Sequence, residues 1–369
     1  LNAPSAGVVT LSWTTDVASS SRVELTPEGG QAQVVEGIVF RSVSTIDDPI
    51  LAGTLPTTFQ HEVVLDGLIS GQRYNYRILS AGDPKPEGSF LGPPELGDDF
   101  QFFLFGDTRT NDASHTEVIS SMADLIAREG PVAFILHTGD MVSTGSSEDQ
   151  WDEFFVIEGP LLKESPILPV YGNHEAILGR TTYEGIFANP PSSTSPSDRW
   201  YSVDMGDLHI AVLDPYCMEF EPHLDWLEED LASSTAKFKI LAVHSPLFTF
   251  SNHPPDFALR DALLPILQAT DVHLVVSGHN HLYERFFGHG IHFVVSGGGG
   301  APLYGTDDNP EADNTGVTRR VGDASLNYIF GRLAGDQIRF EAYTVPGDTL
   351  VDCFVIDAAQ PGAELSCQD

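Results

Sequence analysis

The sequence has 369 residues, 41% of them hydrophobic, so it is long enough for two folded domains and is not disordered by composition. Its 18 Lys and Arg residues against 53 Asp and Glu residues give a formal net charge of −35, and a field of that sign repels nucleic acids and anionic membranes. No apolar run approaches the roughly 20 residues that cross a bilayer, so we expect no membrane span.

Residues 1–80 are predicted to form an all-β domain. Apolar and polar residues alternate along the stretches 9–13 and 74–78, and a period of two puts the apolar side chains on one face of a strand. Leu68 and Tyr74, on either side of a Ser-Gly turn, resemble the tyrosine corner of fibronectin type III-like sandwiches. Because this stretch holds no cluster of potential ligands, we expect a structural or orienting module.

Residues 81–99 are rich in Gly, Pro and acidic side chains, a composition typical of a linker. From residue 100 to residue 369 the pattern changes to apolar runs separated by stretches of helical period; the five runs are 100–105, 132–136, 167–170, 238–243 and 272–276. Near-continuously apolar strands alternating with helices predict an α/β domain whose sheet is covered on both faces. Renewed β character from about residue 327 predicts closing strands.

Each of the five apolar runs leads into a polar motif: Gly106-Asp107-Thr108-Arg109, Gly139-Asp140, Gly172-Asn173-His174-Glu175, Val243-His244-Ser245 and Gly278-His279-Asn280-His281. In open α/β sheets ligands gather at the carboxyl ends of strands, so these motifs should converge. Imidazoles and carboxylates bind first-row divalent or trivalent ions, and two such ions can clamp the attacking and leaving oxygens of a displacement at phosphorus. Because the motifs contain no cysteine, we do not expect a structural zinc site or an iron–sulfur cluster.

This series of motifs resembles the calcineurin-like metallophosphoesterases. With the β-sandwich in front, the chain is similar to purple acid phosphatases and their bacterial relatives. The resemblance implies two β-sheets flanked by helices, preceded by the fibronectin type III-like domain. It also implies an acid phosphatase-like enzyme that hydrolyses small-molecule phosphoesters with two ions of Mn, Fe or Zn and a metal-bound hydroxide nucleophile.

The same resemblance assigns the site residues by position. The first ion would be held by Asp107 and His281, the bridge between the ions would be Asp140, and the second ion would be held by Asn173, His244 and His279. His174 would stand beside the ions, where it could protonate the leaving oxygen or stabilise the transition state. Glu175 fits a supporting partner of the ligands better than a catalytic group. His253, in a Ser-Asn-His-Pro-Pro segment, could line the substrate opening.

Two positions depart from the family pattern. Arg109 stands where many members have a ligand histidine, and a guanidinium cannot ligate a cation. Purple acid phosphatases recover a ligand from the Tyr of Gly-Asp-x-x-Tyr, but this chain has Ser143 there, so the purple colour should be absent. The first ion could be completed by water, or its site could be weak and partly empty.

Arg109 itself admits two interpretations. A buried Arg beside two cations is costly unless an anion joins them, and its planar fork suits phosphate oxygens. We therefore expect Arg109 to bind the phosphoryl group and to offset charge in the transition state. In the alternative, the side chain turns away to pair with an acid such as Asp112 or Glu148.

Other functions stay open on the sequence alone. The loss of a ligand favours a non-catalytic or weakly active binding protein with the phosphoesterase fold; a phosphotriesterase or a nuclease of the same fold is also possible, although the net charge disfavours capture of a polyanion. Cys353 and Cys367 could form a bridge that leaves Cys217 free, or all three thiols could be reduced. Because the layout resembles secreted relatives and the first residue is not Met, we expect a secreted, periplasmic or extracellular protein whose signal has been removed.

Overall fold

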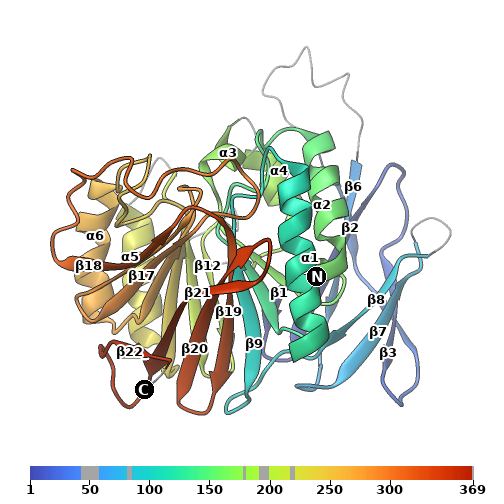
Figure 1. The fold of residues 1–369 in the computed structure, drawn as a ribbon. Helices are drawn as coiled ribbons and strands as arrows, with labels where there is room; N and C mark the ends of the chain where they lie inside the picture. Colours follow the sequence, from blue (N-terminus) through green and yellow to red (C-terminus); the bar gives the residue numbers. More distant parts are fainter. Residues whose placement is uncertain (43–57, 81–84, 178–179, 191–198, 217–220, 368–369) are drawn as a thin grey trace.

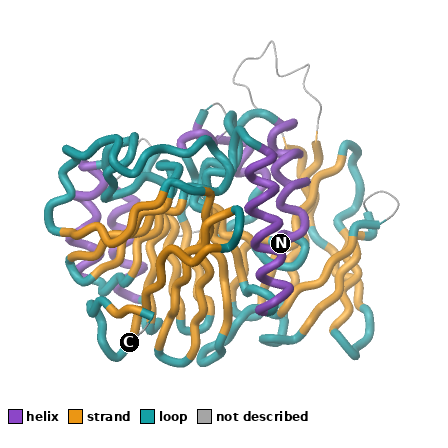
Figure 2. The backbone as a smooth tube through the Cα atoms, viewed as in Figure 1, coloured by secondary structure: helices purple, strands orange, loops and turns teal. Residues whose placement is uncertain are grey.

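The computed structural model describes residues 1–42, 58–80, 85–177, 180–190, 199–216 and 221–367. From residue 100 onward the chain forms four layers, in which two β-sheets pack face to face and helices cover both outer faces (Figures 1 and 2). This arrangement confirms the predicted two-sheet α/β fold. Among the described residues, no helix is long and apolar enough to span a bilayer.

The first sheet supplies three parallel strands with apolar side chains on both faces, followed by antiparallel closing strands. In this part of the chain its strands are β9 (Phe100–Phe105), β10 (Phe134–His137), β11 (Ile167–Pro169), β19 (Leu326–Ala334), β20 (Gln337–Val345), β21 (Thr349–Asp357) and β22 (Leu365–Ser366). The four from β19 onward confirm the β character expected near the C-terminus.

The second sheet also has parallel strands at its centre. In spatial order its strands are β12 (Tyr201–Met205), β13 (Leu208–Leu213), β14 (Phe238–Val243), β15 (Leu274–Ser277), β17 (Ile291–Ser296), β16 (Tyr283–Gly288) and β18 (Val317–Asp323). Residues such as Leu104 and Phe134 from the first sheet meet Ile210 and Ile240 from the second in one buried core. Burial of such side chains is the main stabilising contribution to the domain.

Four of the helices cover the sheets because they carry apolar side chains that pack against the strands. The helices are α1 (Asp112–Glu129), α2 (Glu148–Leu162), α3 (Asn173–Ala176), α4 (Arg180–Ile186), α5 (Glu221–Ser233) and α6 (Phe257–Ala269). On α1 the buried residues include Val118, Ile119, Met122 and Leu125, the spacing of one helix face. The first sheet packs against α1 and α2, and the second packs against α5 and α6.

The N-terminal residues form strands in two sheets, consistent with a β-sandwich. The strands are β1 (Asn2–Ser5), β2 (Val8–Thr15), β3 (Arg22–Pro27), β4 (Gln33–Glu36), β5 (Ile38–Ser42), β6 (Thr58–Leu65), β7 (Arg73–Ile78) and β8 (Glu87–Leu91). The Tyr74 hydroxyl accepts a hydrogen bond from the backbone N–H of Ile69 at 2.9 Å, the contact that a tyrosine corner makes. Whether this sandwich is of the fibronectin type III kind stays a prediction, as do the proposed domain boundaries.

Two features of this region differ from the sequence-based picture. Strand β8 lies inside the expected linker and pairs with β7, because its backbone groups complete the four-stranded sheet. Strands β1, β2, β6 and β5 extend the first sheet, and β1 pairs in parallel with β11 through Asn2 and Ile167. The sandwich is therefore joined to the α/β part by backbone hydrogen bonds.

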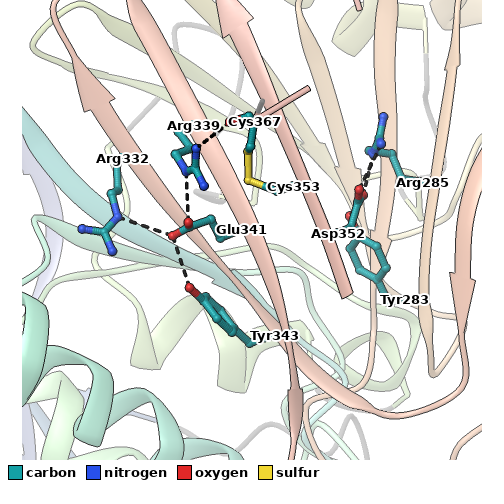
Figure 3. The surroundings of a disulfide bond; sticks show 9 residues. All are labelled: Tyr283, Arg285, Arg332, Arg339, Glu341, Tyr343, Asp352, Cys353 and Cys367. Carbon is teal, nitrogen blue, oxygen red and sulfur yellow. Dashed lines mark hydrogen bonds and ion pairs between the residues drawn. A yellow bond between two sulfur atoms is a disulfide. The ribbon is translucent and has the colours of Figure 1, made fainter. Parts of the chain in front are cut away.

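The C-terminal end is fixed by a disulfide between Cys353 of β21 and Cys367, with the Cα atoms 5.6 Å apart (Figure 3). Of the two interpretations left open by the sequence, the bridge is confirmed. Arg339 donates to the backbone oxygen of Cys367 and to Glu341 in the same region (Figure 3). Cys217 lies outside the described residues.

Candidate metal centre

The five polar motifs follow strands β9, β10, β11, β14 and β15, three from one sheet and two from the other. Asp107, Asp140 and His279 have positive φ angles of 59°, 55° and 67°. The left-handed region is uncommon for residues other than Gly and costs about 1–3 kcal/mol where it is held, so it tends to persist at functional sites. The backbone turns sharply at these residues and directs their side chains toward one another.

Two of the glycines that precede candidate ligands are required because other candidate ligand side chains lie close to their Cα atoms. A Cβ at Gly278 would overlap Oδ2 of Asp107, and a Cβ at Gly139, where φ is +100°, would lie 2.7 Å from Nδ1 of His244. Any larger residue at these positions would displace a ligand side chain. This explains the Gly that precedes Asp140 and His279.

The candidate second metal position gathers four donor groups. Oδ1 of Asn173 lies 2.9 Å from Nδ1 of His279 and 3.1 Å from Nε2 of His244. Nε2 of His244 is also 3.3 Å from Oδ1 of Asp140. One ligand atom each from Asp140, His244 and His279 lie within 4.8 Å of one another. Two imidazoles, an amide oxygen and a carboxylate form a donor set that fits a first-row ion.

His244 is oriented by its other ring nitrogen, since Nδ1 donates to the backbone oxygen of Thr138 at 2.8 Å. That hydrogen bond leaves Nε2 to face the site. Burial lowers the pKa of His244, but the charges of Asp140 and Asp107 raise it to about 9. An ion bound at Nε2 would replace the proton there.

The first position is built by Asp107 and His281. The backbone N–H of His279 donates to both carboxylate oxygens of Asp107, at 3.0 and 2.9 Å. Nε2 of His281 lies 3.6 Å from Oδ1 of Asp107, and its Nδ1 donates to the backbone oxygen of Pro302 at 2.7 Å. Burial, followed by the charge of Arg109, lowers the pKa of His281 to about 4, so the ring is neutral with its lone pair on Nε2.

Arg109 points into this first position. Nε lies 3.3 Å from Oδ2 of Asp140, Nη2 lies 3.4 Å from Nε2 of His281, and Nη1 donates to Oγ1 of Thr110 at 3.2 Å. Its side chain is 16% exposed. Arg109 therefore does not turn outward to pair with Asp112 or Glu148, because its guanidinium pairs with Asp140 instead.

His174 and Glu175 follow Asn173 on α3. Nδ1 of His174 donates to the backbone oxygen of Ser143 at 2.7 Å, and its Nε2 lies 3.8 Å from Oδ2 of Asp140. The buried Glu175 carboxylate accepts from the backbone N–H groups of Asp140, Met141, Val142 and Gly172, at 2.8–3.3 Å. It holds the backbone of the Asp140 turn, the supporting position expected from the sequence.

An aromatic cluster borders the two candidate ligand histidines of the Gly-His-x-His motif. The His253 and His279 rings lie 4.5 Å apart, and the Tyr304 ring stacks on His281 at 4.2 Å. Burial raises the pKa of the Tyr304 hydroxyl, and the nearby charge of Arg109 opposes that rise. Nothing in the spacing of the sequence points to Tyr304; its position after the Gly-rich segment 296–300 is the single available hint.

Comparison with known proteins identifies the family of the α/β part of the chain. Residues 100–283 match the calcineurin-like phosphoesterase family. Purple acid phosphatase 22 of Arabidopsis thaliana is 29% identical over 242 residues, which cover 61% of this chain and 53% of that protein. The chain thus spans about half the length of this curated relative.

Two solved structures share the fold. The purple acid phosphatase PPD1 of yellow lupin has a TM-score of 0.81 at 17% identity, over 96% of this chain and 73% of that chain. The structure of PhoD has a TM-score of 0.68 at 12% identity, over 99% of this chain and 90% of that chain. At such identities the likeness establishes the architecture alone.

Proposed function

Because residues 100–283 are a calcineurin-like phosphoesterase domain, we propose that this protein hydrolyses small-molecule phosphoesters with metal ions held at the carboxyl ends of its strands. The observation that carries the proposal is the approach of two imidazole nitrogens to Oδ1 of Asn173, at 2.9 and 3.1 Å, beside the Asp140 carboxylate. Such a convergence of donors from four separate motifs is what a metal-dependent hydrolase needs.

The family resemblance implies two ions of Mn, Fe or Zn. Asp140, Asn173, His244 and His279 would hold the ion at the second position, and Asp107, His281 and the shared Asp140 would face the first. When bound, ions of this kind make a hydroxide nucleophile available at neutral pH and neutralise negative charge on the phosphoryl oxygens.

The side chains around the ions have separate tasks. Arg109 would bind a phosphoryl oxygen and offset charge that develops in the transition state. His174, whose Nε2 faces Asp140 at 3.8 Å, would give a proton to the leaving oxygen. His253, beside His279, would line the opening through which the substrate enters.

Activity is tested first with the whole protein. We expect hydrolysis of p-nitrophenyl phosphate that is lost with a chelator and regained with manganese, iron or zinc. A panel of mono-, di- and triesters identifies the substrate class. If no ester is hydrolysed under any metal loading while one ion still binds, the non-catalytic binding protein becomes the better assignment.

Arg109→Ala separates two roles of the guanidinium. If Arg109 acts in the transition state, kcat should fall, by about 10²- to 10³-fold if it matters as much as an oxyanion-hole donor. If it only grips the substrate, KM should rise instead. Arg77→Ala is the matched control, because Arg77 is half-exposed on the distant β7. Unchanged kcat and KM, with unchanged inhibition by phosphate, would contradict the proposed role.

We also propose an extracellular or periplasmic location, supported by the Cys353–Cys367 bridge, since such bridges persist in oxidising compartments. Intact mass before and after alkylation without reductant tests the bridge on protein purified from its source. Alkylation of all three cysteines would count against it.

A further inference from the structure

The positively charged guanidinium of Arg109 lies at the first metal position. Nε and Nη2 of Arg109 contact Oδ2 of Asp140 and Nε2 of His281, at 3.3 and 3.4 Å. These two atoms are the ones that an ion at the first position would need. The unprotonated nitrogen of an imidazole has one lone pair. In His281 this nitrogen is Nε2, because Nδ1 donates to the backbone oxygen of Pro302. The guanidinium of Arg109 faces that lone pair.

The placement of Arg109 is fixed by several groups rather than by one contact. Nη1 donates to Thr110, whose hydroxyl is hydrogen-bonded to Ser143 at 2.9 Å. Thr110 has a φ of +82°, a conformation that persists only where the surroundings hold it. The backbone N–H of Arg109 donates to the backbone oxygen of Asp140 at 3.3 Å. Contacts between the loop after β9 and the loop after β10 thus fix the position of the Arg109 side chain.

The aromatic cluster closes the other side. Tyr304 stacks on His281, with an angle of 15° between the rings. The guanidinium is therefore held by Asp140, His281 and Thr110, and Tyr304 packs on the His281 ring behind it. Acidic side chains were available elsewhere: Asp112, Asp149 and Glu153 line a pocket of about 440 Å³ that Arg109 also borders. The side chain contacts Asp140 and His281 instead.

The second position differs from the first because, in the part of the chain that the structure describes, no guanidinium faces its imidazoles and amide. There, Asn173, Asp140 and the two imidazoles face one another, and among the described residues no arginine or lysine side chain is hydrogen-bonded to Asn173, His244 or His279. Its donors suit an ion, whereas the donors of the first position already face a group that stays protonated. An ion added at the first position would lie against that fixed positive charge.

We infer that the guanidinium of Arg109 takes the place of the first metal ion, so that this chain uses one metal ion and one fixed organic cation. The inference rests on the proposed metal site, and it replaces the dinuclear centre implied by resemblance with a mononuclear one. The fixed cation would supply positive charge to the phosphoryl group without binding water. The absence of a metal-ligating side chain at both Arg109 and Ser143 then has one explanation, because a first ion is not bound.

The test is a count of ions. The purified protein is stripped with a chelator, loaded with manganese, desalted and assayed for metal per chain, and its manganese EPR spectrum is recorded. We expect one ion in the wild type, with the spectrum of an isolated ion. Arg109→His, which removes the guanidinium and adds an imidazole, should bind two ions, a twofold rise, with the spectrum of an exchange-coupled pair. Arg77→His, the same substitution on β7, should leave the count at one.

The outcomes separate this inference from the proposed function. Two coupled ions in the wild type would overturn it, as would a correctly folded Arg109→His protein with no more manganese than the wild type. A wild type without any ion would refute the proposed metal site, yet a gain of one ion on Arg109→His would still support the replacement. If Arg109→His does not fold, Arg109→Ala serves in its place, and the wild-type count decides in any case.

Discussion

His292 offers a sharp test of how burial shapes the charge state of this protein. It lies on β17 with 2% of its surface exposed, stacked on Phe354 at 4.6 Å. Among the described residues, neither of its ring nitrogens has a hydrogen-bond partner. Burial, followed by the charge of Arg285, lowers its pKa from 6.5 to about 3. The folded protein therefore keeps the ring neutral over a range of pH in which the unfolded chain protonates it.

The expected change on His292→Phe follows from that difference. A group with a lowered folded pKa contributes its full stability above the unfolded pKa, here 6.5, and this stability is lost as the pH falls toward the folded pKa. At pH 5 the protonation penalty is about 2 kcal/mol, from roughly 1.4 kcal/mol per pH unit below 6.5. Phenylalanine cannot be protonated and leaves no unpaired nitrogen. The larger ring costs about 1–3 kcal/mol by overpacking, but equally at both pH values.

Urea unfolding followed by tryptophan fluorescence, at pH 5 and at pH 8, measures the effect. The free energy of unfolding of the variant relative to the wild type should rise by about 2 kcal/mol between pH 8 and pH 5. Comparing the two pH values removes the packing contribution. An equal difference at both would refute the reasoning, since it would mean that His292 is protonated as readily in the folded protein as in the unfolded chain.

Three further predictions concern other sites. His209 lies between Asp204 and Asp230, each at 2.8 Å, and although burial lowers its pKa the two carboxylates raise it to about 9; His209→Gln should therefore cost about 1–3 kcal/mol of unfolding free energy below pH 6.5, a loss that disappears as the pH rises through 9. Asp140→Asn should reduce both metal content and turnover more than any other single ligand change, with kcat falling about 100-fold or more. Near-normal metal content and kcat would show that Asp140 is not a metal ligand. Tyr304→Phe keeps the stacking on His281 but removes a hydroxyl that senses the charge of Arg109, so KM should rise about 5-fold, the order of one polar contact, with unchanged melting temperature. A lowered melting temperature with unchanged KM would make Tyr304 merely structural.

The sequence alone determined the class of fold and the family. Apolar runs that end in Gly-Asp, Gly-Asn-His-Glu or Gly-His-x-His are local features, because strand period and sharp turns depend on neighbouring residues. The α/β class was predicted from these runs, and the two-sheet architecture and the phosphoesterase family were predicted from the resemblance that the motifs carry; these predictions are confirmed. The residues Asp107, Asp140, Asn173, His244, His279 and His281 were named from their motifs, and their side chains lie together, although their roles as ligands stay predictions.

Tertiary structure decided what depends on contacts between distant parts of the chain. Strand periodicity cannot show that β1 pairs with β11, 165 residues later, since edge strands offer the same backbone groups to many partners. The direction of Arg109 was likewise open. Its long side chain could reach local acids or the site, and the choice is made by Asp140 and His281, which are 31 and 172 residues away. A flexible cation takes the geometry of whichever partners the fold places around it, and here they lie at the first metal position.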